Sequence, residues 1–238
     1  MRAQTPVQVK FECLPQDIDA FGLDCTDSEP CEVLLDLSAV DIAGDRILAG
    51  GNLHTAHSTL YSILLASNDN GVTWSEPFPR QHNSAIEQFQ FFTPQTGWAS
   101  GQSIDPLPRE PFMLLTSDGG RTWRQRPVSD DTVYGSVAQF HFDSEMNGEL
   151  VVDASHGKTM RQELYQTRTG GESWELKQTS NTPLRLKNRP TASAAPLRFR
   201  PDAKSGTLLL ERGRAGARTG TRAWDPIASF AIRVAECR

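Results

Sequence analysis

The sequence lacks any long hydrophobic run, and no apolar stretch approaches the roughly 20 residues that cross a bilayer as a helix. We therefore expect no insertion into a membrane. The first ten residues, MRAQTPVQVK, also lack the apolar core of a secretory signal. Helical hydrophobic periodicity is missing as well, which argues against helix-rich fold classes. The 238 residues are enough for one substantial core.

Cysteine is scarce, and the spacings of the four cysteines do not match the paired ligands of a structural zinc site. Four cysteines allow three pairings. The short segment CTDSEPC favours a Cys25–Cys31 bridge, and the remaining two positions favour a Cys13–Cys237 bridge that joins the ends of the chain. These bridges predict a periplasmic or secreted protein whose signal peptide has been removed. The alternative is four reduced thiols in a cytosolic protein.

Positive charge is rare in most of the chain and concentrated near its end. Residues 1–179 carry 12 basic and 25 acidic side chains, whereas residues 180–238 carry 12 basic and 4 acidic ones. A basic segment can mark a nucleic-acid surface, but only Phe199 and Trp224 are aromatic among these charges. We therefore expect neutralisation within the protein and no nucleic-acid partner.

An octapeptide returns along the chain at nearly constant intervals. SNDNGVTW begins at Ser67, TSDGGRTW at Thr116 and TRTGGESW at Thr167, so the copies lie 49 and 51 residues apart. An apolar run precedes each copy and a short alternating segment follows it, as in a β-hairpin whose turn is the octapeptide. Repeats of this length are typical of propeller blades.

Each octapeptide contains the residue types of a tight turn. An aspartate can accept backbone N–H groups, glycines adopt unusual backbone angles, and the tryptophan can pack between neighbouring sheets. None of these roles requires a substrate. We assign the structural role to Ser67, Asp69, Gly71, Trp74, Thr116, Asp118, Gly120, Trp123, Thr167, Gly171 and Trp174.

A second motif repeats in phase, because FQFFTPQTGW at 89–98 aligns with FHFDSEMNGE at 140–149. Each unit then holds two hairpins. The sequence predicts an all-β fold, a small β-propeller of four-stranded antiparallel blades within a single domain. Four blades are expected, or five if residues 14–40 or 180–196 contain strands. The repeat units are 33–80, 81–130, 131–180, and 181–238 together with 7–13.

The last unit fits the repeat less well than the others. We expect strands at 197–202, 207–213 and 229–236, and an outer strand from residues 7–13. The N- and C-terminal strands would then close one blade and cover an exposed strand edge. This closure would also bring Cys13 to Cys237.

The octapeptide resembles the Asp-box, or bacterial neuraminidase repeat, which has the pattern S/T-x-D-x-G-x-T-W. Two copies match, and the third has Thr169 in place of Asp and Ser173 in place of Thr. Together with FFTPQTGWASG, the second copy resembles the propellers of the photosystem II assembly/stability-factor type. The resemblance covers roughly residues 40–180. It implies a propeller in which the box is a structural turn remote from any ligand site.

The loops at the end opposite the octapeptides are the expected binding face, because function on such scaffolds usually lies on loops. His54 and His57 lack a third ligand nearby in the sequence, so we expect no metal or other cofactor. The acidic residues between 17 and 32 lack the spacing of a calcium loop. The candidate binding residues are His54, His57, Arg80, His82, Asp105, Arg109, Glu110, Asp130, Asp131, Tyr134, His156, Lys158 and Arg161.

Two functions fit this interpretation. The first, which we expect, is a non-catalytic exported scaffold, monomeric on its own, that binds another protein as an assembly factor, inhibitor or immunity-type protein. The alternative is a sialidase-like glycoside hydrolase or a carbohydrate-binding propeller. Sialidase resemblance would imply a tyrosine nucleophile, but the arginine motif of that family is absent, since NRPT at 188–191 does not match it. We therefore expect no enzymatic activity.

Overall fold

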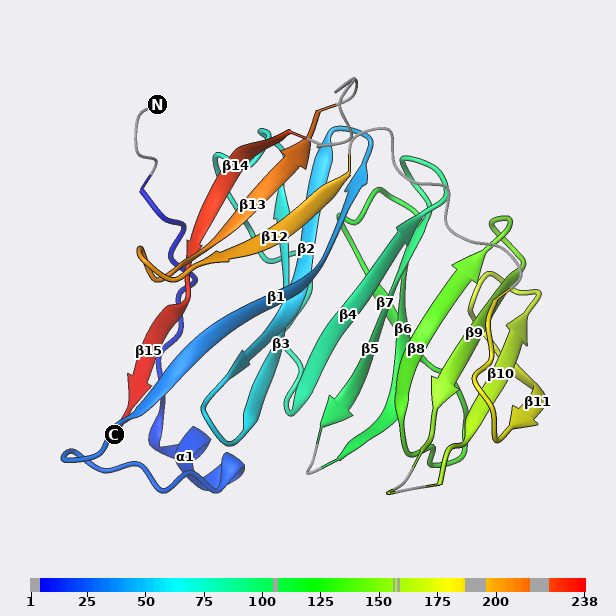
Figure 1. Ribbon diagram of the computed structural model, residues 1–238, viewed down its shortest axis with the longest axis horizontal. Coiled ribbons are helices and arrows are strands. Elements are labelled where there is room, and N and C mark those ends of the chain that lie inside the picture. The colour runs from blue at the N-terminus through cyan, green and yellow to red at the C-terminus, as the bar shows by residue number, and fades with distance from the viewer. Residues whose placement is uncertain (1–4, 105–106, 156, 158, 187–195, 215–222) are drawn as a thin grey trace.

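The computed structural model describes residues 5–104, 107–155, 157, 159–186, 196–214 and 223–238. Its strands form four antiparallel sheets that follow one another like the blades of a fan (Figure 1). Three sheets have four strands and the last has three. One short helix, α1 (Pro15–Phe21), precedes the first strand. The predicted all-β propeller of antiparallel blades is confirmed.

The strand order within each sheet follows the chain, with one exception at the end. The first sheet is ordered β15–β1–β2–β3, the second β4–β5–β6–β7, the third β11–β10–β9–β8 and the fourth β12–β13–β14. The bounds are β1 Cys31–Ala43, β2 Arg46–His54, β3 Thr59–Ser67, β4 Ser84–Phe91, β5 Gly97–Ile104, β6 Pro108–Thr116, β7 Arg124–Pro127, β8 Ser136–Phe142, β9 Gly148–Asp153, β10 Gln162–Thr167, β11 Glu175–Ser180, β12 Leu197–Asp202, β13 Thr207–Gly213, β14 Trp224–Ala231 and β15 Arg233–Cys237.

Three apolar layers hold neighbouring sheets together in the order fourth, first, second, third. The layer between the fourth and first sheets contains Phe230 and Ile63, and the next contains Leu48 and Leu114. Between the second and third sheets, the rings of Trp98 and Phe142 stack with their centroids 3.6 Å apart. Burial of these side chains, on both faces of the first and second sheets and on one face of the third and fourth, stabilises the stack of blades.

The last blade is completed differently from the prediction. The strands expected at 197–202 and 207–213 are present as β12 and β13, but the expected strand 229–236 divides between β14 and β15. β15 pairs with β1 in the first sheet. Residues 7–13 form no strand, and Val7 alone makes a parallel bridge to Phe230 at the edge of β14. The physical reason is the Cys13–Cys237 bridge, which draws this segment from β14 toward the first sheet.

Both predicted disulfides are present, Cys13–Cys237 and Cys25–Cys31. Cys237 lies opposite Cys31 in the β1–β15 ladder, so the two bridges are neighbours. Disulfides persist in oxidising compartments, which indicates an extracellular or periplasmic protein. Among the described residues, no helix is long and apolar enough to span a membrane.

The first two octapeptides form the same hydrogen-bonded turn. The Thr73 hydroxyl donates to Asp69 at 2.6 Å, and its backbone N–H donates to the same carboxylate at 2.8 Å. Thr122 donates to Asp118 in the same way, at 2.6 and 3.0 Å. The Thr73 bonds lower the pKa of Asp69 to about 2. Burial raises the pKa of Asp118, but the bonds from Thr122 outweigh it and lower the value to about 2.

Glycine is required in these turns. Gly120 has φ +75°, and a Cβ atom there would lie 2.9 Å from the Leu48 side chain. The tryptophan that closes each octapeptide lies in or against an apolar layer: Trp74 contacts Phe230, Trp123 is part of the layer between the first two sheets, and Trp174 contacts Phe142. The octapeptides therefore serve the fold.

Replacing Thr169 with aspartate should stabilise the protein, because the third octapeptide lacks the carboxylate. Thr169 Oγ1 accepts the Ser173 N–H at 3.0 Å with a single oxygen. A carboxylate would add charge-assisted bonds of about 1 kcal/mol, or roughly 2–4 °C in Tm. A carboxyl with a depressed folded pKa stabilises above its ordinary pKa, and this gain is lost as the pH falls toward 2. Thermal melts at pH 7 and pH 2.5 measure it. Thr169→Asn is the neutral control, and an equal gain from asparagine would contradict the charge argument.

Candidate functional site

The predicted binding residues do not converge on one place. Asp105, His156 and Lys158 lie outside the described residues. His54 and His57 lie at the β2–β3 connection, beside α1 at the lower end of Figure 1. His54 Nδ1 is 2.8 Å from the carbonyl oxygen of Thr55, and His57 lines a hollow of about 540 Å³ with the Cys25–Cys31 loop. The two histidines therefore have different neighbours and do not form one site.

Three other candidates are engaged in contacts that stabilise the fold. Arg80 pairs with Glu76 at 2.7 Å, and Arg161 pairs with the buried Glu163 at 2.6 Å. His82 stacks on Phe21 with the ring centroids 5.1 Å apart. Such contacts explain these residue types without a ligand.

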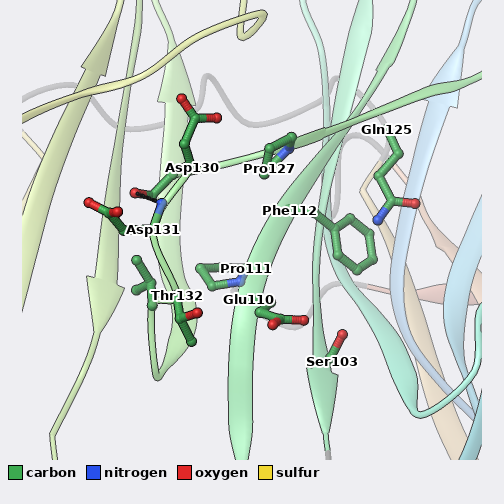
Figure 2. A pocket seen from close by; sticks show the side chains of 11 residues that line it. Ser103, Glu110, Pro111, Phe112, Gln125, Pro127, Asp130, Asp131 and Thr132 are labelled. Carbon is green, nitrogen blue, oxygen red and sulfur yellow. Dashed lines mark hydrogen bonds between the residues drawn. The ribbon is translucent and has the colours of Figure 1, made fainter.

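Glu110, Asp130 and Asp131 share a cleft of about 390 Å³, which we call the outer cleft. It lies between β5, β6 and β7 and the segment 128–135, which is held to β6 by an isolated bridge between Arg109 and Tyr134. Figure 2 shows that the three carboxylates point in different directions, Glu110 toward Ser103 and Asp131 to the opposite side. This arrangement does not focus charge on one reacting atom. Among the described residues, no group of three His, Cys, Asp or Glu side chains is placed to hold a metal ion.

A larger hollow of about 720 Å³ is lined by β1, β4, β8 and β12, one strand from each of the four sheets. We call it the central hollow. Its lining residues are Asp36, Leu37, Ser38, Ala39, Val40, Gln88, Phe89, Gln90, Phe140, Leu197, Arg198, Phe199, Pro201 and Leu208.

Glutamine side chains tie the strands around the central hollow together. Gln88 Nε2 donates to the Val137 carbonyl at 2.8 Å, and Gln139 Nε2 donates to the Leu184 carbonyl at 2.9 Å. The two glutamines occupy the same position in successive blades. The first of these bonds joins β4 to the segment at β8, and the second joins β8 to the segment that follows β11.

A β-bulge recurs at one position of the first three strands that line the hollow. The extra residues are Ser38 in β1, Glu87 in β4 and Ala138 in β8, at the same intervals as the octapeptides. Bulges re-aim a side chain and often lie next to active sites. Serine and alanine occupy this position in the first and third sheets, so the bulge itself does not require a carboxylate. The presence of a glutamate at position 87 therefore needs another explanation.

The environment of Glu87 favours its protonated form. Burial, and then the negative charge of Asp36, raise the pKa of Glu87 above its usual value, while a hydrogen bond from Gln102 Nε2 to Glu87 Oε1 at 3.2 Å opposes this shift. Asp36 is exposed in the central hollow. The backbone of Asp36 packs closely against Gly51, where a Cβ atom would lie 1.9 Å from the Asp36 carbonyl oxygen, so only glycine allows this approach. Two interacting carboxyl groups thus differ in burial.

The fourth sheet supplies the basic wall of the central hollow. Arg198 lies over the ring of Trp224 at 3.9 Å and pairs with Glu211 at 2.7 Å. Arg200 shares the same buried carboxylate at 3.1 Å. One buried carboxylate thus faces two guanidinium groups on the fourth sheet, and one of them, Arg198, belongs to a residue that lines the central hollow.

Asp36, Glu87 and Gln102 were not predicted as site residues, because a polar residue within a predicted strand is normally assigned to the face of the strand that is exposed to solvent. The available signal was the alignment of the repeats, in which Glu87 stands where Ser38 and Ala138 stand in the neighbouring units. A carboxylate at a position that otherwise holds small residues indicates a role beyond the fold.

A scan of protein-family models and a search of curated proteins give no match to this chain. Similar solved structures include an α-L-arabinofuranosidase from Fusarium graminearum with an iminosugar inhibitor, at TM-score 0.42 and 14% identity over 85% of this chain and 62% of that one. An α-L-arabinanase from Penicillium chrysogenum with arabinobiose has TM-score 0.40 and 13% identity over 85% and 63% of the two chains. A fructofuranosidase from Schwanniomyces occidentalis with fructose has TM-score 0.37 and 14% identity over 87% and 48%.

These matches correct two predictions. A non-catalytic scaffold that binds another protein, and the absence of enzymatic activity, were expected, but the similar structures are glycoside hydrolases. The prediction weighed rigid blades and loops and overlooked the carboxylates on the strands that line the hollow. At these identities the likeness concerns the fold, and the chain spans about three fifths of the arabinofuranosidase. The chemistry must therefore be argued from the residues of this chain.

Proposed function

We propose that the chain is a glycoside hydrolase whose reacting carboxyl groups are Asp36, which lines the central hollow, and Glu87, which precedes the lining residue Gln88 on β4. The observation that carries this proposal is the interacting pair itself, one carboxyl shielded and one exposed, on β1 and β4, the two strands of neighbouring sheets that both contribute to the wall of the hollow. Pairs whose surroundings push their pKa values apart are typical of acid and base assignments.

Most glycoside hydrolases use two carboxyl groups, one as a general acid and the other as a base or nucleophile. The raised pKa of Glu87 keeps its proton available, so Glu87 donates that proton to the glycosidic oxygen as the bond from that oxygen to the sugar breaks. The ionised Asp36 supports the positive charge that develops on the sugar, or activates the water that replaces the leaving group. Proton and electron pair both end on the departing alcohol.

The other walls of the hollow suit a sugar. Its volume of about 720 Å³ falls within the range of small-molecule sites. Phe140 and Phe199 offer apolar surface for the C–H faces of a ring, and Arg198 offers N–H donors for hydroxyl groups. We also propose that the octapeptides are Asp-boxes, supported by the recurring bonds to Asp69 and Asp118.

Release of sugar from a panel of substrates tests this function. The panel holds arabinan, arabinofuranosyl, fructofuranosyl and sialyl substrates, and at least one should be cleaved by the wild-type protein. The double variant Asp36→Asn, Glu87→Gln should lose that cleavage by about 10²–10⁴-fold. The matched control, Asp130→Asn with Asp131→Asn in the outer cleft, should keep it. Loss in the control and retention in the Asp36 and Glu87 variant would move the site to the outer cleft.

A further inference from the structure

We infer that Gln102 is a positioning residue that holds Glu87 in place in both of its protonation states. This inference rests on the proposed function for its catalytic meaning, but the hydrogen-bonding partnership can be measured without it. The geometry involves one amide, one carboxyl and the strand pair β4–β5.

Gln102 is placed behind Glu87, away from solvent. Gln102 on β5 lies opposite Ala85 on β4. Glu87, the extra residue of the bulge, follows Ala85 by two positions, so the side chains of Gln102 and Glu87 are close together in the sheet. The Gln102 side chain is buried at 4% exposure, and its Nε2 donates to Glu87 Oε1 at 3.2 Å. Its Oε1 atom is also buried and has no hydrogen-bond partner among the described residues.

A buried amide oxygen without a partner is costly, by about 1–3 kcal/mol, so it calls for an explanation. A carboxyl group that loses and regains a proton supplies one. The observed bond from Nε2 to Oε1 is the one that an ionised Glu87 accepts. When Glu87 is protonated, a half-turn of the amide lets Oε1 accept the carboxyl O–H. The Gln102 amide can thus form a hydrogen bond with Glu87 both before and after Glu87 gives up its proton.

The charges around Glu87 determine how the hydrogen bond from Gln102 affects the protonation of Glu87. Asp36, on β1, is the charged group among the described residues whose field acts on Glu87, and Gln102 is the hydrogen-bonding group from β5. Burial and Asp36 favour the protonated form, and Gln102 moderates them. Without Gln102, Glu87 would hold its proton more tightly and donate it less readily.

Replacing Gln102 with methionine tests the inference, because methionine keeps the length of the side chain and removes both polar atoms. The bond to the ionised carboxylate is the stronger of the two because it is charge-assisted, so its loss favours the protonated form. Titration of the Glu87 carboxyl carbon by ¹³C NMR, in the free protein, should therefore show a midpoint raised by about half a pH unit or more. The high-pH limb of kcat/KM should move by the same amount, with kcat lowered about tenfold. Gln102→Asn, whose amide is one methylene too short to reach, should give the same shift.

Ser100→Ala is the matched control. Ser100 is buried on the same strand two residues away and also has an unpartnered oxygen, but no hydrogen bond joins it to Glu87. Its substitution should leave the Glu87 midpoint unchanged. A midpoint that stays at the wild-type value in both Gln102 variants would overturn the inference. A midpoint that moves in a protein that cleaves no glycoside would keep the partnership and reject the proposed function.

Discussion

A Glu87→Gln variant should lose glycosidase activity by about 10²–10⁴-fold in kcat while its KM changes little. Glutamine keeps the size of the side chain but cannot donate a proton to the glycosidic oxygen. The loss should be largest for substrates with poor leaving groups, because these depend most on protonation. Initial rates on two substrates of different leaving-group acidity measure it.

The same variant should be more stable than the wild type at pH 8. The folded-state pKa of Glu87 is raised, so the folded protein binds more protons than the unfolded chain, and ionisation above that pKa costs stability. Glutamine removes this cost. At pH 4, below the ordinary pKa of a glutamate, the two proteins should melt alike. Thermal melts at the two pH values measure the difference.

Glu149→Gln is the matched control for both measurements. Glu149 accepts a hydrogen bond from Gln166 Nε2 at 2.7 Å, which is also a glutamine–glutamate pair between neighbouring strands. It lies on β9, which contributes none of the described residues that line the central hollow, whereas β4, the strand of Glu87, contributes three. Its substitution should change the rate less than twofold. If Glu87→Gln kept full activity, Glu87 could not be the acid.

Removing the Cys13–Cys237 bridge should cost more stability than any other change considered for this protein. The bridge joins residues 224 positions apart. In the loop-entropy treatment, closure of so long a segment is worth about 5 kcal/mol. Cys13→Ala with Cys237→Ala should therefore lower the free energy of unfolding by most of that amount, as urea unfolding measures.

Cys25→Ala with Cys31→Ala provides the comparison, because that bridge spans only 6 positions. The same treatment gives about 2 kcal/mol for so short a segment. The two variants share their chemistry and their location at the start of β1. Equal losses would show that the bridges act through local packing around Cys237, which is fully buried, and not through chain entropy.

Much of the fold could be predicted because its signals are local. The octapeptides are turns whose hydrogen bonds join residues within four positions, as Ser67 and Gly71 do at 2.8 Å. The hairpin at 197–202 and 207–213 was also readable from its alternating strands. The path of residues 7–13 was not, although the Cys13–Cys237 bridge was predicted, because the pairing of β15 with β1 joins segments that lie far apart in the sequence.

The candidate site was not predicted from the sequence, because the residues predicted to bind a partner were polar residues of loops. Polar loop residues such as His82 and Arg161 turned out to support the fold. Glu87 lies within a strand, where the sequence alone shows neither its burial nor the nearness of Asp36 from the preceding blade. Proximity across blades depends on the arrangement of whole sheets, which no local pattern encodes.

The pairing of β15 with β1 has a consequence for biosynthesis. The sheet that β1 begins is completed by residues 233–237, so a chain emerging from the ribosome cannot finish its first blade until those residues, about 200 positions after β1, have been made. Until then the edge of β1 is open to other strands. A chaperone that shields this edge during export would be expected to raise the yield of the native protein.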